Sequence, residues 1–186
     1  MINYPNKKVI STQKKEYVNY GKRGMKLEEA INLTNSYYLD NNIAVVHKKP
    51  TPIQIIKLDS QKGRIVDAFF KSPSTTDYNG IYKGKYIDFE AKETQNKTSF
   101  PLANIGVHQI EHLKKVKEHG AIAFVIIHFT KLDETYFFDA SYLVACYLAK
   151  DKKSIPYEYI KKHGHLIPQS YFQRVDYLKI IDEYYL

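Results

Sequence analysis

The feature that most constrains the fold is the stretch AIAFVIIHF, residues 121–129, which is apolar at every position except His128. A run of this length, rich in Ile, Val and Phe, is typical of a strand whose two faces are both covered. Helices packed on both sides of a sheet provide that cover. We therefore expect an α/β fold, with a mixed central sheet flanked by helices.

Two segments carry apolar residues at the spacing of an amphipathic helix. The first begins at Met25 and ends at the break 40–42, and the second covers 107–118, with Gly120 as its stop. The remaining predicted strands cover 43–49, 53–58, 64–70, 86–94 and 135–140, and the remaining helices cover 141–149 and 177–186. The Tyr-rich segment 154–176 gives no clear pattern.

Two hairpins are expected in the first half of the chain. The runs 53–58 and 64–70 are joined by a turn-forming cluster, so residues 53–72 are expected to form a protruding hairpin. Further along, Asn79-Gly80 is a two-residue turn signal. This turn would fold the strand that carries Asp77 back beside the strand that carries Glu90.

Composition limits the partners and the compartment. The chain has 186 residues, which favours one domain, and it carries 28 Lys and Arg against 20 Asp and Glu. The net charge of +8 favours a polyanionic partner, although solvated lysines spread over every face would give the same balance. The single Cys146 excludes an intramolecular disulfide, and the lack of an apolar leader or membrane-length segment predicts a soluble, cytoplasmic protein. Residues 1–22, polar and basic, are expected to form a flexible arm.

The predicted strand YIDFEAKET, residues 86–94, alternates between apolar and charged residues. Side chains on a strand alternate between its faces, so Asp88, Glu90 and Lys92 share one face, with Glu90 and Lys92 about 6.6 Å apart. The intervening apolar residues would face the core. Carboxylate oxygens are ligands that Mg²⁺ prefers, and such a site usually needs a second acid.

Asp77 is the candidate for that second acid. An Asp followed on the next strand by Glu-x-Lys is the arrangement of metal-dependent phosphodiester cleavage, in which the acids hold the metal and the lysine stabilises negative charge or steers the attacking water. Asp88 is a fallback ligand. The spacing alone leaves an alternative open, namely an exposed strand face carrying surface salt bridges.

The predicted helix 107–118 contains a second motif. HQIEH places His108 and His112 one turn apart, as in an inverted zinc-protease motif. There is no evident third ligand, so we favour two surface histidines over a zinc site.

The longer stretches around the Glu-x-Lys strand identify a family. STTDYNGIYKGKYIDFEAKETQNKTSFPL, together with RGMKLEEAINLTNSYYL, IAVVHKKPTP and HQIEHLKKVKEHGAIAFVII, closely resembles the RecU family of Holliday-junction resolvases from Gram-positive bacteria and their phages. The similarity extends over nearly the whole chain from Arg23 onward. It implies a single nuclease domain, residues 23–186, with a restriction-endonuclease-like fold of the PD-(D/E)xK type.

The resemblance also implies an activity and a set of site residues. Family members are Mg²⁺-dependent homodimers, with Mn²⁺ as a substitute, and they resolve four-way DNA junctions by paired symmetric nicks in recombination and repair. A recombinase or a branch-migration helicase would be a further partner. The metal ligands would be Thr75, Asp77, Glu90 and Gln109, with Lys92 as the transition-state stabiliser. Helical spacing independently predicts that Gln109 points toward the sheet.

DNA contacts are expected from the arm and from the hairpin of residues 53–72. Arg23 is a candidate phosphate contact, as are four basic residues of the hairpin, Lys57, Lys62, Arg64 and Lys71. Phe69 or Phe70 would lie against exposed bases at the branch point, with burial of both rings in the core as the alternative.

Two functions of other kinds remain open from the sequence. One is a sequence-specific restriction-type endonuclease, which would share every catalytic residue. The other is a non-catalytic protein that binds junctions or regulates a recombinase.

Overall fold

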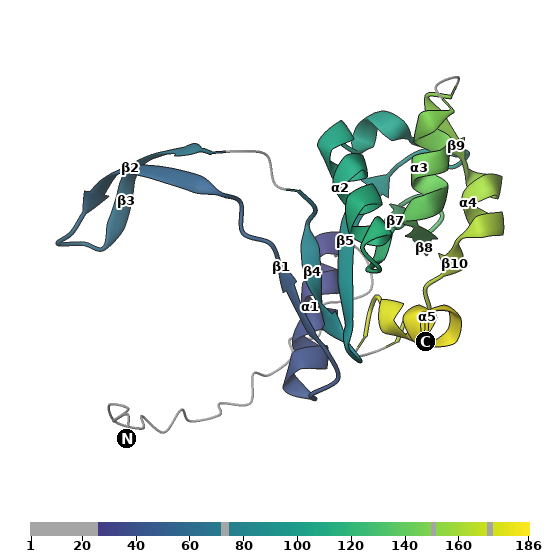
Figure 1. The fold of residues 1–186 in the computed structure, drawn as a ribbon, viewed down its shortest axis with the longest axis horizontal. Helices are drawn as coiled ribbons and strands as arrows, with labels where there is room; N and C mark the ends of the chain where they lie inside the picture. Colours follow the sequence, from purple (N-terminus) through teal and green to yellow (C-terminus); the bar gives the residue numbers. More distant parts are fainter. Residues whose placement is uncertain (1–25, 72–74, 150–151, 171–172) are drawn as a thin grey trace.

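The computed structural model describes residues 26–71, 75–149, 152–170 and 173–186. Its centre is a six-stranded sheet with the order β1-β4-β5-β7-β8-β10 (Figure 1). These strands are β1 (Val45–Lys48), β4 (Tyr78–Tyr82), β5 (Lys85–Thr94), β7 (Ile122–Phe129), β8 (Glu134–Asp139) and β10 (His165–Leu166). β5 and β7 are parallel and all the other neighbours are antiparallel, which confirms the predicted mixed sheet.

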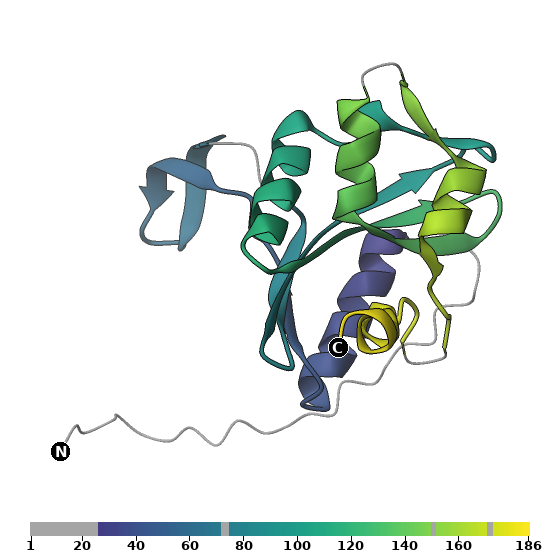
Figure 2. The ribbon, with the colours of Figure 1, turned by 45° about the vertical axis from the view of Figure 1, so that its right-hand side comes forward.

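Helices cover both faces of the sheet, as predicted (Figure 2). One face packs against α1 (Leu27–Asp40) and α5 (Tyr177–Tyr184), and the other packs against α2 (Val107–Glu118), α3 (Ala140–Leu148) and α4 (Tyr157–His163). The sequence did not predict α4 or the small ribbon of β6 (Ser99–Pro101) and β9 (Ser154–Pro156). The short 3₁₀ helix η1 (Leu102–Asn104) comes directly after β6. These elements are too short to show a periodic pattern.

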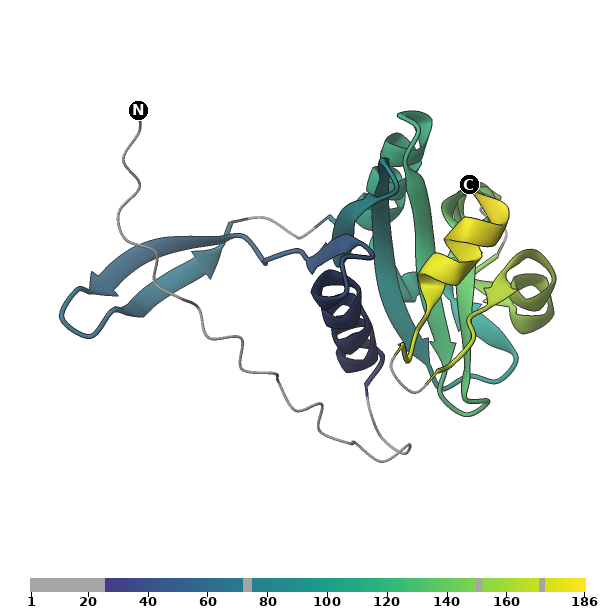
Figure 3. The same cartoon turned by 90° about the horizontal axis from the view of Figure 1, so that it is seen from below.

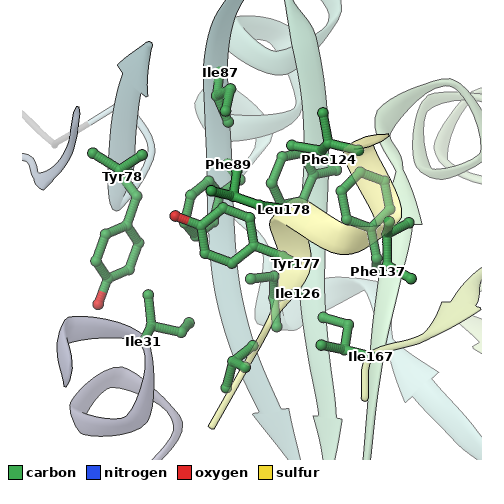
Figure 4. Close-up of a cluster of buried hydrophobic side chains, with 14 of the residues drawn as sticks. Ile31, Tyr78, Ile87, Phe89, Phe124, Ile126, Phe137, Ile167, Tyr177 and Leu178 are labelled. Atoms are coloured by element: carbon green, nitrogen blue, oxygen red, sulfur yellow. The ribbon is translucent and has the colours of Figure 1, made fainter. Parts of the chain in front are cut away.

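An aromatic stack fills the core on the side of α1 and α5 (Figure 4). Tyr78, Phe89, Phe124 and Phe137 come from β4, β5, β7 and β8, and the centroids of neighbouring rings lie 4.9, 4.7 and 4.0 Å apart. Tyr177 of α5 packs on the two central rings. Burial of a large apolar side chain contributes about 1.5–3 kcal/mol. Because Tyr78 of β4 and Phe89 of β5 are both buried in this stack, it stabilises the position of β4 beside β5.

The opposite face has its own apolar core. Ala123, Val125 and Ile127 of β7 are fully buried there, and they belong to the same cluster as Ile110 and Leu113 of α2. β7 is therefore covered on both faces, which confirms the prediction from its apolar sequence.

The turn between β4 and β5 differs from the prediction. Lys83 and Gly84, both with positive φ (46° and 76°), form the two-residue turn, while Asn79 and Gly80 lie inside β4. Gly80 is needed for close approach, because a Cβ atom there would lie 2.2 Å from the carbonyl oxygen of Val45 on β1. The predicted position of the turn is wrong, but its consequence holds, since β4 still returns beside β5.

The hairpin of β2 (Ile53–Asp59) and β3 (Arg64–Phe70) projects from the body of the molecule as a separate two-stranded ribbon (Figures 1 and 3). Phe69 and Phe70 are 54% and 77% exposed, so the alternative of two core phenylalanines is wrong. The predicted protruding hairpin is confirmed. Residues 1–22 and Arg23 lie outside the described residues. Within the described residues, no helix combines the length and apolarity needed to cross a membrane.

Candidate active site

The charged face of β5 is the one that α2 partly covers. Asp88 and Glu90 pair in register with Ala123 and Val125 of β7, and these two residues belong to the core beneath α2. Side chains opposite each other on neighbouring strands point to the same face of the sheet. Asp88, Glu90 and Lys92 therefore share that face, as the alternation predicted.

Asp77 and Glu90 hold each other in place where β4 begins. Tyr78, the first residue of β4, pairs with Phe89 of β5. Asp77, the residue just before β4, therefore lies opposite Glu90. The backbone N–H of Asp77 donates to Glu90 Oε2 at 3.1 Å, and the backbone N–H of Ala91 donates to Asp77 Oδ2 at 3.3 Å. The two carboxylates predicted to act together are thus brought together, each held by the backbone of the other strand.

Lys92 completes this cluster. Its Nζ forms an ion pair with Glu90 Oε1 at 2.6 Å, although that oxygen accepts no hydrogen bond of acceptable geometry. Burial and, to a smaller extent, the nearby Asp77 raise the pKa of Glu90 to about 7, with Lys92 partly opposing both effects. A fully buried glutamate beside a second acid, with one ammonium paired to it, is a site that favours additional positive charge.

The donor set suits a hard divalent cation. Two carboxylates with waters and substrate oxygens are what Mg²⁺ usually takes, and Oε1 of Glu90, whose only neighbour of opposite charge in the described part of the chain is Lys92, can serve as such an oxygen donor. Across the described ranges, no three His, Cys, Asp or Glu side chains are grouped so that they could share one metal ion. The zinc interpretation of His108 and His112 therefore has no support, and His108 is exposed.

Asp88 has a different set of partners from Glu90. Thr76 donates its hydroxyl to Asp88 Oδ1, and Lys49 Nζ and the Tyr86 hydroxyl donate to Oδ2 at 2.8 and 3.0 Å. His112 Nε2 lies 3.1 Å from the same Oδ2. These partners engage both oxygens of this fully buried carboxylate, so Asp88 is held as an internal anchor. Its fallback role as a metal ligand stays a prediction.

Lys49 and Thr76 were not predicted as site residues from the sequence, and His112 was predicted only as a surface residue. The available signal was Asp88 itself, because a carboxylate predicted on a partly covered strand face needs a charged partner. Neither partner is near Asp88 in sequence. Lys49 is 39 positions away and Thr76 is 12 positions away, so only the fold identifies them.

Thr75 and Gln109 were predicted as further ligands. Thr75 is exposed, and its Oγ1 accepts a hydrogen bond from Lys49 Nζ at 3.2 Å. Gln109 folds back on the N-terminus of its own helix, where Oε1 accepts from the backbone N–H of Gly106 at 2.9 Å. Their roles as metal ligands stay predictions.

The predicted DNA contacts of the hairpin lie on its surface. Lys57, Arg64 and Lys71 are all exposed. Phe69 pairs with Gln54 and Phe70 with Ile53, so the two neighbouring rings point to opposite faces of the ribbon. Their role in DNA binding stays a prediction, as does that of Arg23.

Fold and site together define a mixed α/β protein with two acids and a lysine clustered where β4 enters the sheet beside β5. The family model described as RecU, recombination protein U, matches residues 22–183. The chain therefore belongs to the RecU family.

Relatives from Bacillus extend this likeness over nearly the full chain. A protein of Bacillus cytotoxicus named "Holliday junction resolvase RecU" is 52% identical over 197 residues, covering 99% of this chain and 98% of the relative. A protein of the same name from Bacillus cereus strain G9842 is 56% identical over 172 residues, covering 89% and 86%. Among solved structures, the Holliday junction resolvase Hjc of Archaeoglobus fulgidus is similar at a TM-score of 0.42 and 11% identity, covering 73% of this chain and 94% of Hjc.

Proposed function

We propose that this protein is a structure-specific endodeoxyribonuclease that resolves four-way (Holliday) DNA junctions by paired nicks, in recombination and repair. The observation that carries the proposal is the cluster of Asp77, Glu90 and Lys92 in a chain of the RecU family. Its matched relatives are named Holliday junction resolvases. We further propose that residues 23–186 form one nuclease domain with a restriction-endonuclease-like fold, acting in the cytoplasm.

Asp77 and Glu90 would hold Mg²⁺, or Mn²⁺ in its place. When bound, the ion would polarise the scissile phosphate and lower the pKa of a water molecule. Thr75 and Gln109 would complete the set of oxygen donors, and for this Gln109 would have to release the N–H of Gly106. Glu90 must be ionised to serve as a ligand. Its pKa is about 7 in the absence of metal, and a bound cation would favour the ionised form.

Lys92 would act on the reacting phosphate. Its side chain is 25% exposed, so the ammonium can meet a substrate from the position in which it pairs with Glu90. There it would stabilise the negative charge that builds up as a water oxygen bonds to phosphorus and the P–O3′ bond breaks. The products would be a 5′-phosphate and a 3′-hydroxyl, which a ligase can rejoin.

Recognition of the junction would come from the projecting ribbon. Its exposed Lys57, Arg64 and Lys71 can contact phosphates, which position a protein on DNA without reading its sequence. The exposed rings of Phe69 and Phe70 can stack on bases that are unpaired at a branch point. A recombinase or a branch-migration helicase would deliver or move the junction.

The protein would act as a homodimer. Paired nicks on two strands need two active sites, and the described part of the chain holds one cluster of Asp77, Glu90 and Lys92. Two copies related by a twofold axis would present one cluster to each of the two equivalent strands.

The test is a cleavage assay on a labelled four-way junction and a matched duplex, with Mg²⁺ or with Ca²⁺. We expect the wild type to cut the junction with Mg²⁺, and Asp77→Ala and Lys92→Ala to bind it but cut at least about 100-fold more slowly. Glu118→Ala and Lys114→Ala, which break only an exposed helical ion pair, serve as matched controls.

Three outcomes would contradict the proposal. Full activity of Asp77→Ala or Lys92→Ala would remove the site assignment. Cutting that follows a duplex sequence and ignores branch structure would favour a restriction-type endonuclease. Junction binding without metal-dependent cutting by the wild type would favour a non-catalytic binding or regulatory protein.

A further inference from the structure

Lys49 contacts the segment that carries Asp77 through both its backbone and its side chain. It directly follows β1, and its backbone N–H donates to the carbonyl oxygen of Asp77 at 2.8 Å. Its Nζ donates to the hydroxyl oxygens of Thr76 at 2.5 Å and Thr75 at 3.2 Å. Three consecutive residues, 75–77, are therefore tied to this single lysine.

Asp88 fixes the position of that ammonium. Lys49 Nζ lies 2.8 Å from Asp88 Oδ2, and Asp88 is fully buried while the lysine side chain is 15% exposed. Thr76 also donates to Asp88, so the lysine, the threonine and the aspartate form a closed triangle of polar contacts. A buried ionised pair that is fully hydrogen-bonded holds its members in one arrangement.

The contacts of Lys49 separate it from an ordinary phosphate ligand. An ammonium group has three N–H donors, and three oxygens, those of Thr75, Thr76 and Asp88, accept from this one. No donor is left to grip DNA unless one of these bonds breaks. The exposed lysines of the ribbon have no such buried acid beneath them, so the position of Lys49 points to an internal role.

Segment 75–77 is also the place where the geometry of the site is set. Asp77 meets Glu90 just before the start of β4, where the pairing of β4 with β5 gives way to the connection from the projecting ribbon. Replacing a residue that hydrogen-bonds to metal ligands, without touching the metal itself, typically lowers metal affinity or activity by about 10–100-fold.

We infer that Lys49 is a positioning residue of the metal site: anchored on Asp88, it holds residues 75–77 so that Asp77 stays opposite Glu90. The inference rests on the proposed function, because it takes Asp77 and Glu90 as the metal ligands. It assigns Lys49 no contact with metal or DNA.

The test uses the full chain and Mn²⁺ alone as the probe, with Mn²⁺ binding followed by electron paramagnetic resonance. Lys49→Met should weaken Mn²⁺ binding at least about tenfold, whereas metal-free affinity for a four-way junction should stay within about twofold of the wild type. Lys49→Arg, which keeps the charge, should recover part of the loss. Lys83→Met is the control, since it removes one charge from an exposed pair with Asp182.

A second variant covers the case in which Lys49→Met leaves Asp88 unpaired and unfolds the chain. Lys49→Met combined with Asp88→Asn removes both charges, so it should fold and still bind Mn²⁺ weakly. Unchanged Mn²⁺ affinity in the folded variant would overturn the inference, and so would lost junction affinity with intact Mn²⁺ binding, which would make Lys49 a DNA contact. Glu90→Gln in the same assay tests the proposed function separately: if it binds Mn²⁺ and cuts like the wild type, the proposed function fails whatever Lys49 does.

Discussion

Two of the β-hairpins in the described structure, β2–β3 and β4–β5, have opposite surroundings. Both are antiparallel, and both turn through a glycine with positive φ, Gly63 and Gly84. β4–β5 has a further strand on each side, whereas β2–β3 pairs only with itself. The same backbone unit is thus part of the core in one place and a free arm in the other.

This difference decides which chemistry each hairpin can carry. In β4–β5, Asp88 and Glu90 are fully buried. The partners that buried charges need are supplied by β5 itself, by residues next to β1 and β4, and by α2, namely Lys92, Lys49, Thr76 and His112. In β2–β3, Ile56 and Phe70 are 62% and 77% exposed, and an isolated two-stranded ribbon gains little stability of its own in water. The first hairpin suits catalysis by fixed charges, and the second suits contact with a partner.

Deleting the projecting ribbon should have the largest effect. If residues 54–69 are replaced by Asn-Gly, we expect junction affinity to fall about a thousandfold, toward that of nonspecific DNA binding. The free energy of unfolding should change by less than about 1 kcal/mol, because β2 and β3 form a sheet separate from the central one. Gel-shift titration with Ca²⁺ and chemical denaturation would measure the two quantities.

A ribbon deletion that leaves junction affinity intact would assign recognition to the body of the molecule. A deletion that unfolds the chain would show that the ribbon is part of the core after all. Either result would end the contrast between the two hairpins.

The next largest effect concerns Glu90 and pH. Its pKa is about 7 in the folded protein against about 4.5 for an ordinary glutamate, so the metal-free folded state holds a proton that the unfolded state releases. The free energy of unfolding should therefore fall as pH rises from about 4.5 to about 7, by up to about 3 kcal/mol. Glu90→Gln should remove most of this slope.

Denaturation of the metal-free protein at several pH values would test this. Asp67→Asn is the matched control, since it neutralises an exposed carboxylate on the projecting ribbon. A slope that is the same in the wild type and in Glu90→Gln would mean that the ionisation of Glu90 does not cause the pH dependence. Added Mg²⁺ should flatten the slope, because a bound cation favours the ionised carboxylate.

The sequence predicted the two hairpins with unequal success, and the reasons are physical. The alternation of β5 and the unbroken apolar run of β7 were sufficient to place Glu90 and Lys92 on one face, because strand periodicity is a local property. Gly80 was misread as a turn residue, since the sequence cannot distinguish a glycine that permits positive φ from one that lets β1 approach. The partnership of Lys49 with Asp88 depends on the order of strands, and no local pattern encodes it.

The two turn glycines offer the smallest effect and the most direct comparison. Gly63 has φ 59° and Gly84 has φ 76°, and a Cβ atom on either would meet nothing within 4 Å, so alanine at each position would suffer only backbone strain, about 1 kcal/mol. In Gly84→Ala that strain should lower the free energy of global unfolding by about the same amount, because β4–β5 unfolds with the core. In Gly63→Ala the strain should appear as faster amide hydrogen exchange in β2–β3. The free energy of global unfolding should change by less than about 0.3 kcal/mol, because the ribbon opens locally without unfolding the core. Equal losses in the two variants, measured by denaturation and hydrogen exchange, would mean that the projecting ribbon and the central sheet unfold as one unit.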